Sequence, residues 1–103
     1  MTSNANTPAF KLECPELWRE QCFFAGTWSA GSSGESIEVV NPATDEILAR
    51  VPKLSAKDLD HALTAAHQGF IFWRGLSAPE RSAKLRRWFE LMQEHKEDLA
   101  RIM

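Results

Sequence analysis

A proline turn between two short apolar runs places the strongest constraint on how this chain folds. Val39-Val40 and Ile47-Leu48 flank the turn, which holds Asn41, Pro42 and the polar pair Asp45-Glu46. Proline fixes its own φ and disfavours a helical conformation at the residue before it, so Asn41 is expected to be extended and Pro42 to open the turn. Residues 38–52 therefore predict a strand, a turn and a second strand.

Further strands are expected before this turn. Residues 23–28 form an aromatic-rich strand broken by a glycine, and the small residues 30–34 are a flexible reversal before a strand at 36–40. Two or three antiparallel strands result. A pair of strands is marginally stable in water, so their apolar face needs a partner surface. That face comprises Phe23, Val39 and Ile47.

Two long amphipathic helices are predicted in the second half of the chain. Ser55 is placed to cap the first, with Asp58 at the acidic position of a capping box, and residues 77–80 repeat this pattern for the second. Apolar side chains recur at spacings of three and four, so each helix should bury one face. The stripes comprise Leu59, Ala62, Leu63, Ala66, Phe70 and Trp73, and then Leu85, Trp88, Phe89, Met92, Leu99, Ile102 and Met103.

The two ends of the chain differ in character. Residues 1–15 begin with small polar side chains and are expected to form a mobile arm, and a short helix is expected at 15–21. The second long helix is expected to run to Met103, where its stripe stops without a Gly, an Asn or a proline. The predicted organisation is an arm at 1–15 and a truncated domain at 16–103.

Composition argues against several classes of function. The 103 residues carry a formal net charge of -2, so nothing favours nucleic acid or an anionic membrane as a partner. No stretch approaches the roughly 20 apolar residues of a membrane span, and no signal peptide is recognised, so a cytoplasmic protein is expected. The densest basic patch has acidic neighbours and is interpreted as a solvated helix face. It comprises Arg81, Lys84, Arg86 and Arg87.

No catalytic, cofactor-binding or metal-binding residue is predicted in the chain. Cys14 and Cys22 fit neither a zinc site nor a redox pair. The histidines lack the spacing of a helical metal pair, and Asn41 is interpreted as a turn residue because a proline follows it. The tryptophans are interpreted as core groups rather than as a ligand box. These histidines and tryptophans are His61, His67 and His95, and Trp28, Trp73 and Trp88.

The order of these motifs resembles the N-terminal region of the aldehyde dehydrogenase superfamily. Residues 23–28 are similar to the family's opening strand, with Ala25 in place of the usual Asn, a departure judged minor because Gly26 still supplies the turn. Further similar segments follow in the same order: Asn41-Pro42-Ala43-Thr44, Val51-Pro52, Phe72-Trp73-Arg74, Pro79-Glu80-Arg81 and Leu85-Arg86-Arg87-Trp88-Phe89. Residues 51–53 and 91–100 are most similar to the succinate- and glutarate-semialdehyde dehydrogenase branch.

The resemblance implies an α/β fold for the complete protein, of which this chain is an α+β fragment with a β-hairpin followed by two amphipathic helices. It implies an enzyme that oxidises succinate semialdehyde or a related semialdehyde to the carboxylic acid with NAD or NADP. A cysteine thiolate would attack the aldehyde and a later Glu would activate water. These groups and the dinucleotide site would follow Met103, so the fragment should bind no cofactor and should be inactive alone.

The partners implied are the remainder of the polypeptide, the aldehyde and, for the complete enzyme, further copies in a homo-oligomer. In some family members backbone carbonyls equivalent to those of Val39 and Val40 help to hold a structural monovalent cation, with an acidic ligand that would lie beyond Met103. The alternative hypothesis is a noncatalytic interaction module whose helix pair presents a groove to a partner protein. An in-frame continuation after Met103 would distinguish the two.

Overall fold

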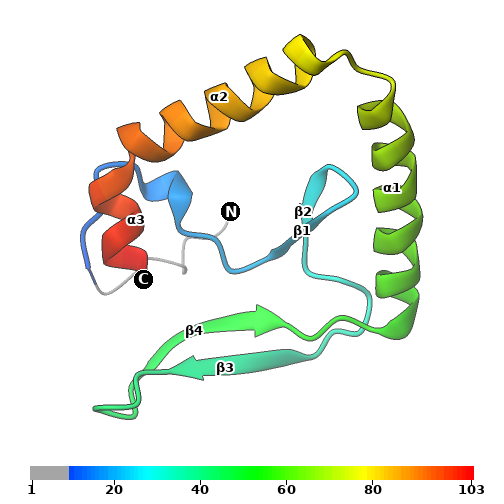
Figure 1. Ribbon diagram of the computed structural model, residues 1–103. Coiled ribbons are helices and arrows are strands. Elements are labelled where there is room, and N and C mark those ends of the chain that lie inside the picture. Colours follow the sequence, from blue (N-terminus) through cyan, green and yellow to red (C-terminus); the bar gives the residue numbers. More distant parts are fainter. Residues whose placement is uncertain (1–9) are drawn as a thin grey trace.

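The computed structural model describes residues 10–103, in which two small β-hairpins precede three helices (Figure 1). The elements are the 3-10 turn η1 (Pro15–Leu17), the strands β1 (Cys22–Phe24), β2 (Thr27–Ser29), β3 (Ser36–Val40) and β4 (Ile47–Pro52), and the helices α1 (Ala56–Arg74), α2 (Ala78–Glu94) and α3 (Lys96–Ile102). The predicted α+β order of strands followed by helices is confirmed. The short helix expected at 15–21 is reduced to η1.

The first hairpin joins β1 to β2 through a two-residue turn. Phe23 pairs with Trp28 across it, so the segment predicted as one broken strand is a complete antiparallel hairpin. Both turn residues have positive φ, 52° at Ala25 and 80° at Gly26, as a type I′ turn requires. Gly26 therefore does not supply the turn alone, and Ala25 holds a conformation that its Cβ disfavours.

The second hairpin confirms the strand, turn and strand predicted at 38–52. β3 and β4 pair antiparallel, with a register shift between Val39 and Val40. The Asn41 carbonyl accepts the amide of Asp45 at 2.7 Å, and its side-chain oxygen accepts the amide of Ala43 at 2.9 Å. Asn41 is thus a turn residue, as predicted.

Both predicted helix starts are confirmed. Ser55 and Asp58 form a complete capping box on α1, and Ser77 and Glu80 form one on α2. The prediction of a single second helix is wrong, because α2 ends at Glu94 and α3 begins after His95, whose φ of -106° and ψ of 21° leave the helical range. The chain changes direction at this break (Figure 1).

The apolar stripes are not buried within the chain, contrary to expectation. Leu63 on α1 is 68% exposed and Trp88 on α2 is 63% exposed. α1 and α2 run along two sides of an open frame rather than side by side, so the two helices do not bury their stripes against each other (Figure 1). Among residues 10–103, Leu12 is the one apolar side chain that is buried, at 6% exposure. Trp88 and Trp28 are therefore not core groups in this chain, and Trp73 is half-buried.

The dimensions of the chain agree with this absence of a common core. The radius of gyration is 16.8 Å, whereas a compact domain of this length has about 13 Å. The accessible surface is 8141 Å², whereas a compact monomer of this mass exposes roughly 5,800 Å². Local hydrogen bonding, rather than a hydrophobic core, therefore defines the elements.

Candidate functional site

A buried carboxylate joins the start of α1 to the loop between the two hairpins. Asp58 is 8% exposed, and its Oδ2 accepts the amide of Ser32, the amide of Ser55 and the hydroxyl of Ser55, each at 3.0 Å. These hydrogen bonds lower the pKa of Asp58 to about 2, and the backbone amides of Ser32 and then Ser55 contribute most to this shift. Asp58 is therefore an ionised structural anchor at neutral pH.

Gly31 is required at this Asp58 junction. Its φ is 76°, which favours glycine. A Cβ at this position would lie 2.6 Å from Leu54 Cδ2 and 3.0 Å from Asp58 Oδ2. The loop passes this close to α1 because glycine has no side chain there.

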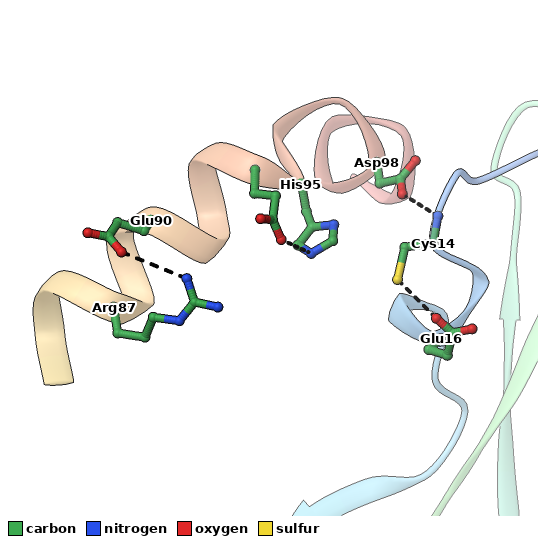
Figure 2. A network of polar contacts seen from close by, with 7 residues as sticks. Cys14, Glu16, Arg87, Glu90, His95 and Asp98 are labelled. Atoms are coloured by element: carbon green, nitrogen blue, oxygen red, sulfur yellow. Dashed lines mark hydrogen bonds and ion pairs between the residues drawn. The ribbon is translucent and has the colours of Figure 1, made fainter.

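A second buried carboxylate joins α3 to the segment before η1. Asp98 is 3% exposed and accepts the backbone amides of Glu13 at 3.0 Å and Cys14 at 2.8 Å (Figure 2 shows the Cys14 contact). The Glu13 amide is the main cause that lowers the pKa of Asp98 below its ordinary value of 3.8. Residues 10–14, assigned by the sequence to the arm, thus lie against α3, and residues 1–9 of that arm lie outside the described residues.

Neither carboxylate is arranged for acid or base chemistry. The acceptor oxygens of Asp58 and Asp98 hold backbone amides, and their lowered pKa values keep them ionised at neutral pH, so they cannot donate protons there. Sequence reasoning identified Asp58 only as a capping residue and gave Asp98 no role. For Asp58 the available signal was an acidic residue in the first turn of a predicted helix, which does not reveal the distant amide that it binds. Asp98 gave no such signal, because the predicted helix continued through it.

The cysteines and histidines described by the structure do not converge on a reactive centre. A hydrogen bond from the Cys14 thiol to the Glu16 carboxylate is the main cause that raises the pKa of this thiol, so it is held as an unreactive thiol. His61 makes an edge contact with the Phe24 ring at 5.8 Å between centroids, and His95 lies beside Glu94. Within residues 10–103, no group of three or more His, Cys, Asp or Glu side chains is placed to hold a metal ion.

The basic residues of α2 lie on a solvated face. Arg86 and Arg87 both reach Glu90, at 3.5 Å and 3.8 Å, and their side chains are 71% and 62% exposed (Figure 2 shows the Arg87 pair). Exposed pairs of this kind contribute little to stability. Their geometry agrees with the interpretation of this patch as a solvated surface.

A hollow lies between the first hairpin and α1. It measures about 610 Å³, and Phe24, Gly26, His61 and Ala65 are among the residues that line it. A ligand site ordinarily combines an apolar lining with several polar groups that point to one place. Here His61 and Gln68 are the polar side chains among the lining residues, and the hollow is open, so it identifies no ligand.

Comparisons with known proteins agree with one another. A profile described as "Aldehyde dehydrogenase family" matches residues 28–103. The glutarate-semialdehyde dehydrogenase of Pseudomonas putida is 46% identical over 93 residues, which cover 90% of this chain and 19% of that protein. The succinate-semialdehyde dehydrogenase of Escherichia coli named for NADP(+) is 44% identical over the same share of each chain.

Solved structures give the same result for the fold. The succinate-semialdehyde dehydrogenase of Burkholderia pseudomallei superimposes with a TM-score of 0.85 at 41% identity, over 90% of this chain and 19% of its own. A structure described as an NADP dependent enzyme of E. coli gives a TM-score of 0.84 at 44% identity, over 88% and 19%. The chain thus spans about a fifth of the length of the curated relatives that it matches.

The helices of the structure also bear on membrane insertion. Among residues 10–103, none of the helices combines the length and the apolarity that crossing a bilayer requires. The matched profile, the identities above 40% and the superposition extend over most of the described residues. This chain belongs to the aldehyde dehydrogenase family.

Proposed function

We propose that this chain is the N-terminal portion of an NAD(P)-dependent dehydrogenase that oxidises a semialdehyde, of the succinate or glutarate class, to the carboxylic acid. One observation carries this proposal. This chain is similar in sequence to about one fifth of the length of relatives that are named for these substrates. The apolar stripes of its helices α1 and α2 are exposed. A surface of this extent and composition is typical of one that another part of a protein covers.

The segment contributes scaffold rather than chemistry to the proposed enzyme. Its ionised Asp58 and Asp98 hold backbone amides, and its Cys14 thiol has a raised pKa, so none of these groups is proposed to touch substrate. The thiolate nucleophile, the water-activating Glu and the site for NAD or NADP are proposed to come from residues that follow this segment. A monovalent cation held in part by the carbonyls of Val39 and Val40 remains a prediction of the same kind.

The proposed partner of the exposed stripes is the remainder of the dehydrogenase polypeptide, and the complete enzyme is proposed to form a homo-oligomer. The domain organisation is proposed as an arm at 1–15, of which residues 13 and 14 contact α3, followed by the N-terminal part of a dehydrogenase domain at 16–103. A cytoplasmic location is retained as part of the proposal. Relatives from rice and Arabidopsis are named as mitochondrial, so the location of a tagged complete chain would test that part.

The test compares the chain alone with the same chain extended in frame to the length of its relatives. NAD(P)-linked oxidation of succinate semialdehyde and glutarate semialdehyde is measured for both. We expect turnover from the extended protein and none from the chain alone. An extended protein that folds and oxidises neither aldehyde would contradict the proposed substrate class, and the absence of any in-frame extension would favour the interaction module.

A further inference from the structure

The segment before β1 lies across the junction of α2 and α3. Leu12 is buried at 6% exposure, whereas the other large apolar side chains of residues 10–103 are half-buried or exposed. Leu17 helps to line a small hollow of about 180 Å³ together with residues of α2 and α3. Those residues are Trp88, Leu91, Met92, His95 and Leu99. Residues 10–17 therefore cover part of the apolar surface that the break at His95 creates.

Hydrogen bonds from α3 hold this segment at one place. Asp98 accepts the amides of Glu13 and Cys14, which precede it by 85 and 84 residues (Figure 2 shows the Cys14 contact). Arg101 donates from its Nη1 to the carbonyl of Lys11 at 2.9 Å. Hydrogen bonds to an ionised acceptor are stronger than neutral ones, and a buried carboxylate that loses its donors is unfavourable. The contact is thus directional and depends on the charge of one side chain.

We propose that residues 10–17 form a strap that closes over the α2–α3 junction, and that Asp98 is the latch that holds it. The strap opens when Asp98 can no longer accept both amides, and α3 then loses the segment that fixes its position. The charged and titratable groups around the latch lie on both sides of it. His95 and Arg101 belong to the helices, and Lys11, Glu13, Cys14 and Glu16 belong to the strap. The Asp58 junction lies on other elements, so opening the strap leaves it intact.

The test uses Asp98→Asn in the full chain, with Glu97→Gln as the matched control. Asn presents an NH2 donor in place of one of the two carboxylate oxygens, each of which accepts one amide, so it cannot accept both amides in this geometry. Glu97 lies in the same first turn of α3, is exposed and carries the same charge. We expect amide hydrogen exchange at Glu13 and Cys14 to accelerate about tenfold or more in Asp98→Asn and to stay unchanged in Glu97→Gln.

A second measurement distinguishes a local latch from general unfolding. Exchange at the Ser32 amide, which Asp58 holds, should stay protected in Asp98→Asn, while trypsin should cleave faster after Lys11. Unchanged protection at Glu13 and Cys14 in Asp98→Asn would overturn the proposal. Loss of protection at Ser32 as well as at the strap would also overturn it, because the residue would then support the whole chain.

Discussion

The polar junctions and the apolar faces of this molecule differ in how completely the chain satisfies them. Asp58 and Asp98 are both buried, and each accepts two backbone amides. The amides of Ser32 and Ser55 bind Asp58, and those of Glu13 and Cys14 bind Asp98. Most large side chains in the stripes of α1 and α2, in contrast, remain exposed, as Leu59, Leu63 and Trp88 illustrate. A directional hydrogen bond needs one partner, whereas a hydrophobic face needs a whole surface.

This difference is what we expect of a chain that matches a fifth of the length of its relatives. The hairpin turns, the capping boxes and the two carboxylate junctions use residues that the chain itself contains. Burial of the stripes would require a further surface, as proposed above, and the chain covers 19% of the length of its relatives. Changes at the polar junctions should therefore act in the chain alone, and changes at the stripes should act only in an extended protein.

Leu63→Ala tests the apolar side of this contrast and has the largest expected effect. Leu63 is 68% exposed, so the substitution should change the free energy of unfolding of the chain alone by less than about 0.5 kcal/mol. In the extended protein, where the stripe is proposed to be buried, it should cost about 2 to 5 kcal/mol. Denaturant unfolding followed by helical circular dichroism measures both values, with His67→Ala as the exposed control. Equal losses in the two proteins would contradict the contrast.

Gly31→Ala tests the Asp58 junction. The added Cβ meets Leu54 and Asp58 and must also adopt a φ of 76°, so we expect a loss of about 2 to 4 kcal/mol in the free energy of unfolding. Gly34 has almost the same φ, 75°, with nothing within 4 Å of its Cβ position. Gly34→Ala should therefore cost only the backbone strain, about 1 kcal/mol. Similar losses at the two positions would show that the close approach at Gly31 has no energetic weight.

Acid should open the polar junctions before it affects the apolar contacts. The pKa of Asp58 is lowered from 3.8 to about 2, so its stabilising contribution is fully present above pH 3.8 and is lost as the pH falls toward 2. Exchange at the Ser32 amide, corrected for the intrinsic pH dependence, should accelerate in that range. Protection that persists through pH 2 would argue against Asp58 as the group that holds the loop.

Ser55→Ala removes an N-cap that is also part of the Asp58 junction, whereas Ser77→Ala removes an N-cap that serves its own helix alone. Both hydroxyls accept an amide in the first turn of their helix, at Asp58 and at Glu80. The Ser77 substitution should cost about 1 kcal/mol of helix stability. The Ser55 hydroxyl also bonds Asp58 Oδ2 and lies 3.1 Å from the Ser32 hydroxyl, so its removal should cost more. Thermal unfolding of the two variants measures the difference, and a larger loss at Ser77 would be inconsistent with the junction.

Ala25→Asn has the smallest expected effect, and it is stabilising. Ala25 holds a φ of 52°, and Asn tolerates this region better than Ala. We expect a gain of about 0.5 kcal/mol in the stability of the first hairpin. A shift in the hairpin population measured by NMR would check this, with Ala30→Asn as the control outside the turn. A loss of stability would mean that this turn does not favour Asn-Gly.

Local features of the fold could be predicted from the sequence because their causes are local. Ser55 and Ser77 are followed three residues later by an acid, and Asn41 is followed by a proline, so each motif contains both of its interacting groups. The break at His95 was not predicted, since the apolar stripe continues through it at helical spacing. The pattern fixes which face is apolar but not whether the helix axis continues straight.

Long-range features required the structure. Nothing near Asp98 in the sequence identifies the amides of Glu13 and Cys14 as its partners, because backbone amides are the same at every non-proline residue. The exposure of Trp88 could not be predicted either, since periodicity indicates that a face is apolar and not which surface covers it. The family, in contrast, was recognised from the order of several short motifs along the chain.

The most direct measurement is small-angle X-ray scattering of the chain alone, at concentrations where it is monomeric. Local structure held by polar junctions, without a common core, predicts a radius of gyration near the 16.8 Å of the structure. A value of about 13 Å would show a compact, self-sufficient domain. It would contradict the proposal that the remainder of a dehydrogenase polypeptide covers the stripes. A value of about 32 Å would show an unfolded chain and would contradict the claim that the junctions hold the elements in place.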